Sequence, residues 1–385
     1  MTEKLYYEDS RMRRFTARVA GCGKADGRYA VTLDRTAFFP EGGGQPADGG
    51  TLGGLPVLHV SEKDGEVFHW LPSPLPVGAE AEGVLDWDAR WRAMQNHTGE
   101  HIVSGLVHGK YGYDNVGFHM GADGVIVDFS GYLTPEQLSD VELEANRVVQ
   151  SDVPVTQSFP APEELPHLEY RSKLELTENV RLVTIGGCDV CACCATHVSR
   201  TGEIGVVRIL ESIRRRDGVR IRMMSGLDAL RELRGRARSV SKISALLSAK
   251  PEEAAQAVEK LLADKAKLEW EIGDLKRETV KRLTEELAPA GGNRVFFEPL
   301  FSGDDLRLLV NAAAPFCGGV CAAFSGSDGA GYAYVVGSVS KDVRAGAGEL
   351  NAALSGRGGG TPEMIRGSVK ATRAQIEAYF REKQF

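Results

Sequence analysis

Two short motifs with the same spacing constrain this chain more than any other feature of its sequence. His97 and His101 stand four positions apart in QNHTGEH, and Cys193 and His197 repeat that spacing about ninety residues later in CACCATHV. On a helix, two residues four positions apart project from one face a single turn apart. Three imidazoles and a thiolate form a ligand set that zinc favours. Because the fold must bring two distant segments together to close such a site, the pattern indicates a catalytic metal pocket rather than a local finger.

The choice of sulfur ligand is less direct, because four cysteines crowd one segment. They are Cys188, Cys191, Cys193 and Cys194. Cys193 is favoured because it alone repeats the four-residue spacing to His197, whereas Cys188-x-x-Cys191 is also compatible with a structural zinc or with buried thiols. His119 is a weaker candidate, since a lone histidine in a strand-like segment is more often a core residue. Four protein ligands leave zinc no open position, so catalysis requires a ligand that moves, a fifth coordination position or a water activated nearby.

The charge of the chain is uneven. Its 385 residues, enough for two or three domains, carry a formal net charge of −7. Residues 200–238 contain eleven Arg against five Asp or Glu, which makes this segment +6 and the remainder −13. The segment therefore indicates either a partner held by its phosphates or a solvated face of strand and helix.

The sequence also predicts where the protein resides. The first residues lack the apolar core of a signal peptide, and no run approaches about 18 apolar residues, so no membrane span is expected. Clustered cysteines in a chain without an export signal more often bind metal or stay reduced. We therefore expect a cytoplasmic protein.

The first two of four expected parts form the N-terminal half. Residues 1–88 predict a small β-barrel from strand-like runs at 28–40 and 55–71, with a turn at 63–65 and a glycine-rich loop in PEGGGQ (40–45). Residues 89–226 predict an α+β core, with a helix over 88–108 and strands at 125–133, 181–188 and 203–226. A second helix is expected after Thr134, whose side chain would form a capping box with Gln137.

The other two parts follow a change of composition. Residues 227–289 predict a helical linker that is broken near 248–251, with a coiled-coil-like stripe at Val258, Leu261, Lys265, Leu268, Ile272 and Leu275. The stripe is compatible with packing inside the chain or with pairing to a second subunit. Residues 290–385 predict a C-terminal α/β domain with buried strands at 307–315 and 331–340. There GRGGG (356–360) precedes an expected helix and could be a phosphate cradle or a tight packing turn.

Taken together, these motifs resemble the AlaX family in its long form, the free-standing relatives of the editing and C-terminal domains of alanyl-tRNA synthetase. The segment RTAFFPEGGGQ (35–45) is similar to the family's glycine-rich barrel motif, and HTGEH (97–101) and CCATH (193–197) are similar to its two zinc motifs. The region around 356–360 is similar to the family's DHH-associated C-terminal domain. The four motifs occur in the family's order. Gly99, Glu100 and Ala195 differ, because relatives often have Ala, Gln and Gly there.

The resemblance implies a trans-acting deacylase that hydrolyses the ester of a wrong amino acid, serine or glycine, on the tRNA for alanine. It implies one zinc ion per chain, held by His97, His101, Cys193 and His197. It implies that Thr36 helps to recognise the serine hydroxyl and that Gln45 lines the pocket. Too few residues precede the zinc helix for a ligase core, and a homodimer through the helical linker or the C-terminal domain is a further expectation. A pocket that hydrogen-bonds the serine hydroxyl would reject alanine, which lacks it.

Two other functions remain open at this point. The first is a non-catalytic tRNA-binding module with a structural zinc. The second is a threonyl-type editing enzyme, which shares the two zinc motifs but not the glycine-rich motif or the C-terminal domain.

Overall fold

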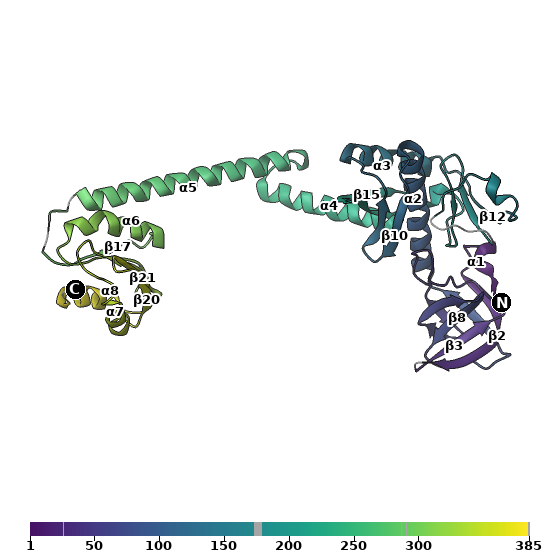
Figure 1. Cartoon of the computed structure of the whole chain (residues 1–385), viewed down its shortest axis with the longest axis horizontal. Helices are drawn as coiled ribbons and strands as arrows, with labels where there is room; N and C mark the ends of the chain where they lie inside the picture. The colour runs from purple at the N-terminus through teal and green to yellow at the C-terminus, as the bar shows by residue number, and fades with distance from the viewer. Residues whose placement is uncertain (26, 173–178, 286, 290, 384–385) are drawn as a thin grey trace. The chain divides into compact units, whose positions relative to one another are not determined.

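A computed structural model describes residues 1–25, 27–172, 179–285, 287–289 and 291–383. The chain divides into two compact units, Met1–Lys242 and Ile243–Phe385 (Figure 1). Both units mix helices and strands, which confirms the α+β class. The finer division into four domains stays a prediction. Within the described part of the chain, no helix has the length and apolar character needed to cross a membrane.

Among its described residues the first unit contains three larger sheets, two long helices and most of a third, which continues past Lys242 into the second unit. Its elements are β1 Glu3–Lys4, α1 Leu5–Glu8, β2 Arg14–Ala25, β3 Arg28–Leu33, β4 Arg35–Thr36, β5 Gly50–Leu52, β6 Leu55–Val57, β7 His59–Lys63, β8 Glu66–Leu71, β9 Glu80–Leu85, α2 Trp87–Tyr111, β10 Asn115–Gly121, β11 Gly124–Phe129, α3 Pro135–Gln150, β12 Val155–Ser158, β13 Leu182–Ile185, β14 Asp189–Ala192, β15 Val207–Arg215, β16 Gly218–Ser225 and α4 Gly226–Leu247.

The N-terminal strands form a nearly closed antiparallel sheet of seven strands, in the order β6-β5-β9-β2-β3-β8-β7. Strand β2 joins the two halves of this sheet, because its first half pairs with β9 and its second half pairs with β3. The register shifts between Val19 and Gly21, where a bulge bends the strand. The expected turn at 63–65 is confirmed, since Asp64 and Gly65 both have positive φ, as the hairpin requires.

Helix α2 carries the histidine motif through the middle of the unit. It begins after Asp86, whose carboxylate accepts a hydrogen bond from the Ala89 amide, and ends at Gly112 in the left-handed conformation. Its central residues, 93–105, are buried on every side, because neighbouring elements surround the helix. The expected helix is therefore confirmed and slightly longer, and its motif is shielded from water.

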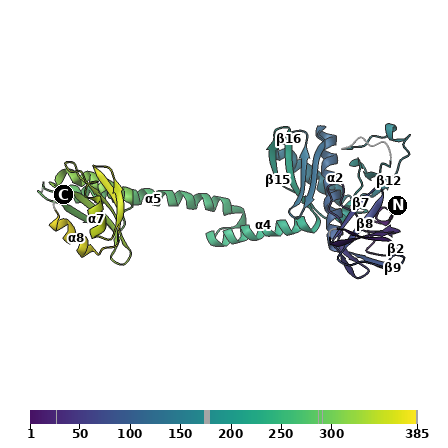
Figure 2. The same ribbon diagram turned by 60° about the horizontal axis from the view of Figure 1, so that its bottom comes forward.

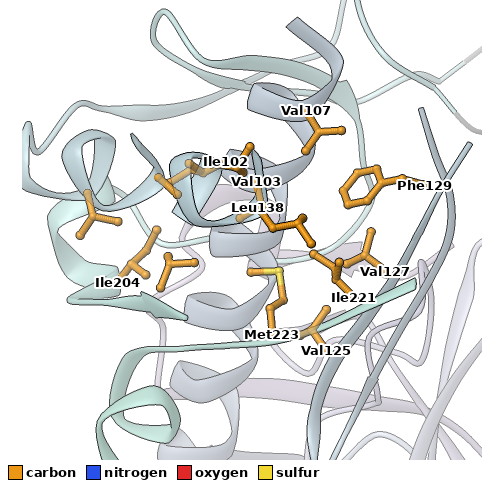
Figure 3. Close-up of a cluster of buried hydrophobic side chains, with 14 of the residues drawn as sticks. Ile102, Val103, Val107, Val125, Val127, Phe129, Leu138, Ile204, Ile221 and Met223 are labelled. Carbon is orange, nitrogen blue, oxygen red and sulfur yellow. The ribbon is translucent and has the colours of Figure 1, made fainter. Parts of the chain in front are cut away.

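The four-stranded sheet β10-β11-β16-β15 packs against α2 and α3, and Figure 2 shows its strands β15 and β16 beside α2. Figure 3 shows Ile102 and Val103 of α2 facing Val125 and Met223 of this sheet across a cluster of buried side chains. Helix α3 has the expected capping box between its N-cap threonine and the glutamine three positions on. This packing fixes one face of α2 and leaves the opposite face toward the third sheet, β12-β13-β14.

The second unit is a five-stranded sheet, β17-β18-β19-β21-β20, with helices on both faces. Its elements are α5 Ala254–Glu285, β17 Arg294–Phe297, α6 Gly303–Ala313, β18 Cys321–Ser327, β19 Gly331–Gly337, α7 Ala347–Ala353, β20 Arg357–Gly360, β21 Met364–Val369 and α8 Arg373–Glu382. The linker break is confirmed, because α4 ends at Leu247 and a short 3₁₀ turn at Pro251–Glu253 precedes α5. The apolar side chains of the stripe on α5 are exposed.

The strand expected at 307–315 is wrong, because this segment belongs to α6. Ser302 caps the helix and forms a capping box with Asp305. Leu306, Leu309 and Val310 are buried at helical spacing against β18 and β19. The neighbouring apolar residues masked this periodicity in the sequence, because a short buried helix and a buried strand both give an uninterrupted run of apolar residues.

The helix expected after GRGGG is also wrong. Residues 357–360 form the edge strand β20, which pairs with the strand β21 instead. A Cβ on Gly358 would lie 2.4 Å from the Arg366 carbonyl, and one on Gly360 would lie 2.2 Å from the Met364 carbonyl. The glycines therefore allow close strand contact. They do not provide a helix N-terminus for a phosphate.

Candidate metal centre and its cavity

The fold brings the two sequence motifs together. One ligand atom from each of His97, His101, Cys193 and His197 lies within 4.8 Å of all the others. The two histidines of the first motif come from adjacent turns of α2, and the other two residues follow β14. The Sγ atom of Cys193 lies 3.6 Å from Nε2 of His97 and 3.4 Å from Nε2 of His197. The four side chains thus surround one point, as a tetrahedral site requires.

In each histidine of this cluster, the ring nitrogen Nδ1 forms a hydrogen bond with a neighbouring side chain. Nδ1 of His97 donates to Oε1 of Gln45 at 2.9 Å, and Nδ1 of His101 donates to Asp189 at 3.1 Å. Nδ1 of His197 donates to Oγ1 of Thr98 at 3.1 Å, since that hydroxyl gives its own proton to the Met94 carbonyl. In its neutral form each ring therefore presents an unprotonated Nε2 to the centre, as zinc ligation by neutral imidazole demands, and at His101 a bound cation would displace the second proton.

Burial and the neighbouring groups shift the pKa values of three members of the cluster. Burial opposes the thiolate of Cys193, but His97 and His197 hold the pKa of this thiol well below its usual range. Burial lowers the pKa of His197 to about 3. Burial also opposes the charged form of His101, but hydrogen bonds to Asp189 and Cys193 hold its pKa well above the ordinary value. A thiolate beside imidazoles is the donor set that zinc binds, so the residues fit this metal.

The three neighbouring cysteines differ from Cys193. Burial raises the pKa of Cys188 to about 12, and it also raises the pKa values of Cys191 and Cys194. Only Cys191 joins a second, smaller group of potential ligands, with His101 and Asp189. His119 is exposed on β10 and lies outside both groups. These environments favour Cys193 as the sulfur ligand.

Asp189 links the cluster to a cation that sequence reasoning missed. Its carboxylate accepts two hydrogen bonds from Arg171, at 2.7 and 2.8 Å, while it orients His101. Although burial opposes ionisation of Asp189, its bonds to His101 and Arg171 lower its pKa. No spacing signal marks this residue, because its partner histidine lies on a different element.

The glycine-rich loop approaches the cluster from the N-terminal sheet. Gly43 and Gly44 have φ values of 59° and 77°. A Cβ on Gly44 would lie 2.4 Å from the ring of Phe118, which itself packs 4.8 Å from the ring of His97. These glycines therefore allow the close approach that places Gln45 against His97.

A buried ion pair ties this loop to α2. Arg90 is fully buried, and its Nε donates to Oδ1 of Asp48 at 2.9 Å. The same guanidinium donates to the carbonyls of Ser10 and Ala37 at 3.0 and 2.6 Å. Asp48 also accepts the Phe39 amide at 2.6 Å. The pair thus fixes the start of the glycine-rich segment against the helix that carries His97.

Thr36 and Gln45 are buried rather than among the residues that line the cavity described below. The hydroxyl of Thr36 lies 2.8 Å from Nε2 of His69 and accepts the Phe38 amide at 3.1 Å. His69 donates from Nδ1 to the Val31 carbonyl at 3.1 Å, so Thr36 donates to His69. Gln45 also donates to Oγ1 of Thr196 at 3.1 Å. Their roles toward substrate stay predictions.

A cavity of about 930 Å³ opens beside the cluster. Its lining includes His97, His101 and Cys193 together with Gly43 of the glycine-rich loop. Aromatic side chains and both acidic and basic groups line the rest, so the cavity can accept a polar organic ligand next to the candidate metal centre.

Comparisons with known proteins support the class that this site suggests. Residues 180–222 match the family described as the threonyl and alanyl tRNA synthetase second additional domain. The segment includes both residues of the second motif, Cys193 and His197. The segment that carries the second motif is therefore similar to part of a domain named after two kinds of aminoacyl-tRNA synthetase.

Relatives match over most of the chain. The chain is 29% identical to alanyl-tRNA editing protein AlaX-L of Pyrococcus horikoshii, over 98% of this chain and 96% of that protein. It is 32% identical to the alanine–tRNA ligase of Halorubrum lacusprofundi, but covers only 40% of that enzyme, and 36% identical to that of Thermofilum pendens, covering 32%. The resemblance to the AlaX family is thereby confirmed, and the chain is a relative of the free-standing alanyl-tRNA editing proteins.

Proposed function

We propose that this protein is a cytoplasmic, metal-dependent deacylase that acts in trans on tRNA(Ala) carrying the wrong amino acid, with serine or glycine as the acyl group. The observation that supports it most is the cluster of His97, His101, Cys193 and His197 beside a large cavity, in a chain similar to AlaX-L over nearly its whole length. The reaction is hydrolysis of the ester between the amino acid and the tRNA.

In this proposal the four clustered side chains hold one zinc ion. Bound zinc would position the substrate, polarise its carbonyl or lower the pKa of a nearby water. The protein's own part is to fix the ligands. Gln45, Asp189 and Thr98 each hold one histidine ring.

The tRNA is expected to meet the Arg-rich hairpin of the first unit. Arg214 and Arg215 at the end of β15 and Arg216 in the turn before β16 are all exposed. Phosphates attract such groups without reading sequence. The exposed stripe on α5 is proposed as a homodimer contact, since apolar side chains at coiled-coil spacing gain stability when a second helix covers them.

The test uses protein that has been stripped of metal and reloaded with zinc. Reloaded protein should release serine from seryl-tRNA(Ala), stripped protein should not, and Cys193→Ala should bind zinc poorly and act slowly. Failure of the zinc-loaded protein to hydrolyse any mischarged tRNA would leave a non-catalytic tRNA-binding module. Hydrolysis of seryl-tRNA(Thr) alone would indicate a threonyl-type editing enzyme.

A further inference from the structure

Glu100 is a buried acid that the proposed function has not used. It lies on α2 between His97 and His101, its side chain lines the cavity, and the residue is 3% exposed. The other acidic residues of the described lining, Glu62, Asp64 and Asp114, are more exposed. Glu100 is therefore the acid in this lining that is most shielded from bulk water.

One oxygen of this carboxylate is fixed by the protein. Oε1 of Glu100 accepts a hydrogen bond from the hydroxyl of Ser104 and another from Nδ2 of Asn115, at 2.6 Å for the latter. The donors come from α2 and from the start of β10, so they hold the carboxylate from two elements. The two hydrogen bonds described at this carboxylate both go to Oε1.

The lysine and arginine side chains of the described lining are engaged by other groups. Lys4 pairs with Glu62 at 2.6 Å, and Arg171 is bonded twice to Asp189. Arg181 donates to Gln157 and to the carbonyls of Cys193 and Ala195. A buried carboxylate is costly unless a cation or further donors satisfy it. The ion pair of Arg171 is with Asp189 and not with Glu100.

We propose that Glu100 binds the α-ammonium group of the aminoacyl moiety through Oε2. The inference rests on the proposed function, because every aminoacyl ester carries this group next to the scissile carbonyl. A carboxylate fixed beside the candidate metal centre would hold the ammonium on the α2 side of the cavity. The contact would favour aminoacyl esters over esters without an α-amine, whatever the amino-acid side chain.

The test measures binding, so it does not depend on turnover. One probe is 3′-(L-seryl)amino-3′-deoxyadenosine, which cannot be hydrolysed as an ester. The matched probe carries a glyceroyl group, in which a hydroxyl replaces the ammonium. Titration calorimetry with zinc-loaded protein gives the ratio of the two dissociation constants. Wild-type protein should bind the seryl probe at least about tenfold more tightly, as a hydrogen-bonded charge pair would give.

Glu100→Gln should remove that preference, because it keeps Oε1 as an acceptor for Ser104 and Asn115 but loses the charge. Glu62→Gln removes an exposed carboxylate of the same cavity and should leave the ratio near the wild-type value. Equal affinity of wild-type protein for both probes would overturn the inference, and so would an unchanged ratio in Glu100→Gln. An equal loss of turnover by Glu100→Gln on aminoacyl and hydroxyacyl esters, with the binding ratio intact, would assign Glu100 to the hydrolytic step instead.

The two proposals fail separately. If the protein distinguishes the probes but hydrolyses no mischarged tRNA, the deacylase proposal fails and the ammonium contact stands. If it hydrolyses seryl-tRNA(Ala) but binds both probes equally, only the role of Glu100 is lost.

Discussion

Removing Asp48 should destabilise the first unit strongly, because it leaves the Arg90 charge buried and unpaired. Arg90 is fully buried, and the Asp48 side chain is 4% exposed. Breaking a buried ion pair by deleting one partner costs about 3–5 kcal/mol. Asp48→Ala also deprives the Phe39 amide of its acceptor. We therefore expect a loss near the upper part of that range.

Urea unfolding followed by tryptophan fluorescence measures this effect, since Trp87 and Trp91 lie on α2 close to the pair. Glu82→Ala is the control. It breaks an ion pair with Arg14 in the same unit, but the two side chains are 59% and 68% exposed. Such a surface pair contributes at most about 1 kcal/mol. The Glu82→Ala curve should almost coincide with that of the wild type.

A double variant separates the effect of the buried charges from the effect of the side-chain volume. Asp48→Leu combined with Arg90→Met replaces both charges by apolar groups, and it should unfold at a higher urea concentration than Asp48→Ala. A loss below about 1 kcal/mol for Asp48→Ala, equal to the control, would refute the reasoning that this pair holds the glycine-rich segment against α2.

Three further predictions concern stability and metal binding. Burial lowers the pKa of His69 from 6.5 to about 4, so protons favour the unfolded chain as the pH falls from about 6.5 to about 4. His69→Gln should therefore remove up to about 3 kcal/mol of acid destabilisation, measured by urea unfolding across that pH range. Parallel curves of stability against pH for the two proteins would contradict this. Asp189→Asn should weaken zinc affinity about 10- to 100-fold in chelator competition, because His101 loses a charged acceptor. The circular dichroism spectrum should stay unchanged. Unaltered zinc affinity would show that Asp189 does not orient His101 for the metal. Gly105→Ala would put a Cβ 2.6 Å from the Cys188 carbonyl and should lower the free energy of unfolding by about 1–3 kcal/mol. At Gly109 a Cβ meets nothing within 4 Å, so Gly109→Ala should raise the free energy of unfolding by up to about 1 kcal/mol. A thermal melt that ranks the two variants otherwise would argue against the packing at Gly105.

The local elements of the first unit could be predicted because local chemistry specifies them. The capping box at Thr134, the turn at Asp64 and the helix that carries His97 all depend on residues within a few positions of one another. The errors in the second unit arose where a decision required tertiary contacts. The run that became α6 is apolar enough for either structure, and the glycines of β20 serve pairing with β21.

The site shows the same division. The spacing of the two motifs predicted the four residues that the fold brings together. It could not predict which side chains hold the rings, because Asp189 and Thr98 meet their histidines only after folding. The roles of Thr36 and Gln45 toward substrate are implied by the family resemblance and stay predictions; their described contacts are with His69, His97 and Thr196.

The central claim is tested most directly by comparing the deacylation rates of seryl-tRNA(Ala) and alanyl-tRNA(Ala) with the same zinc-loaded protein. We predict rapid release of serine and release of alanine near the uncatalysed rate, since a pocket built to hydrogen-bond a hydroxyl rejects the analogue lacking it by several orders of magnitude. Equal rates for the two esters, or no release of serine above the spontaneous rate, would contradict it.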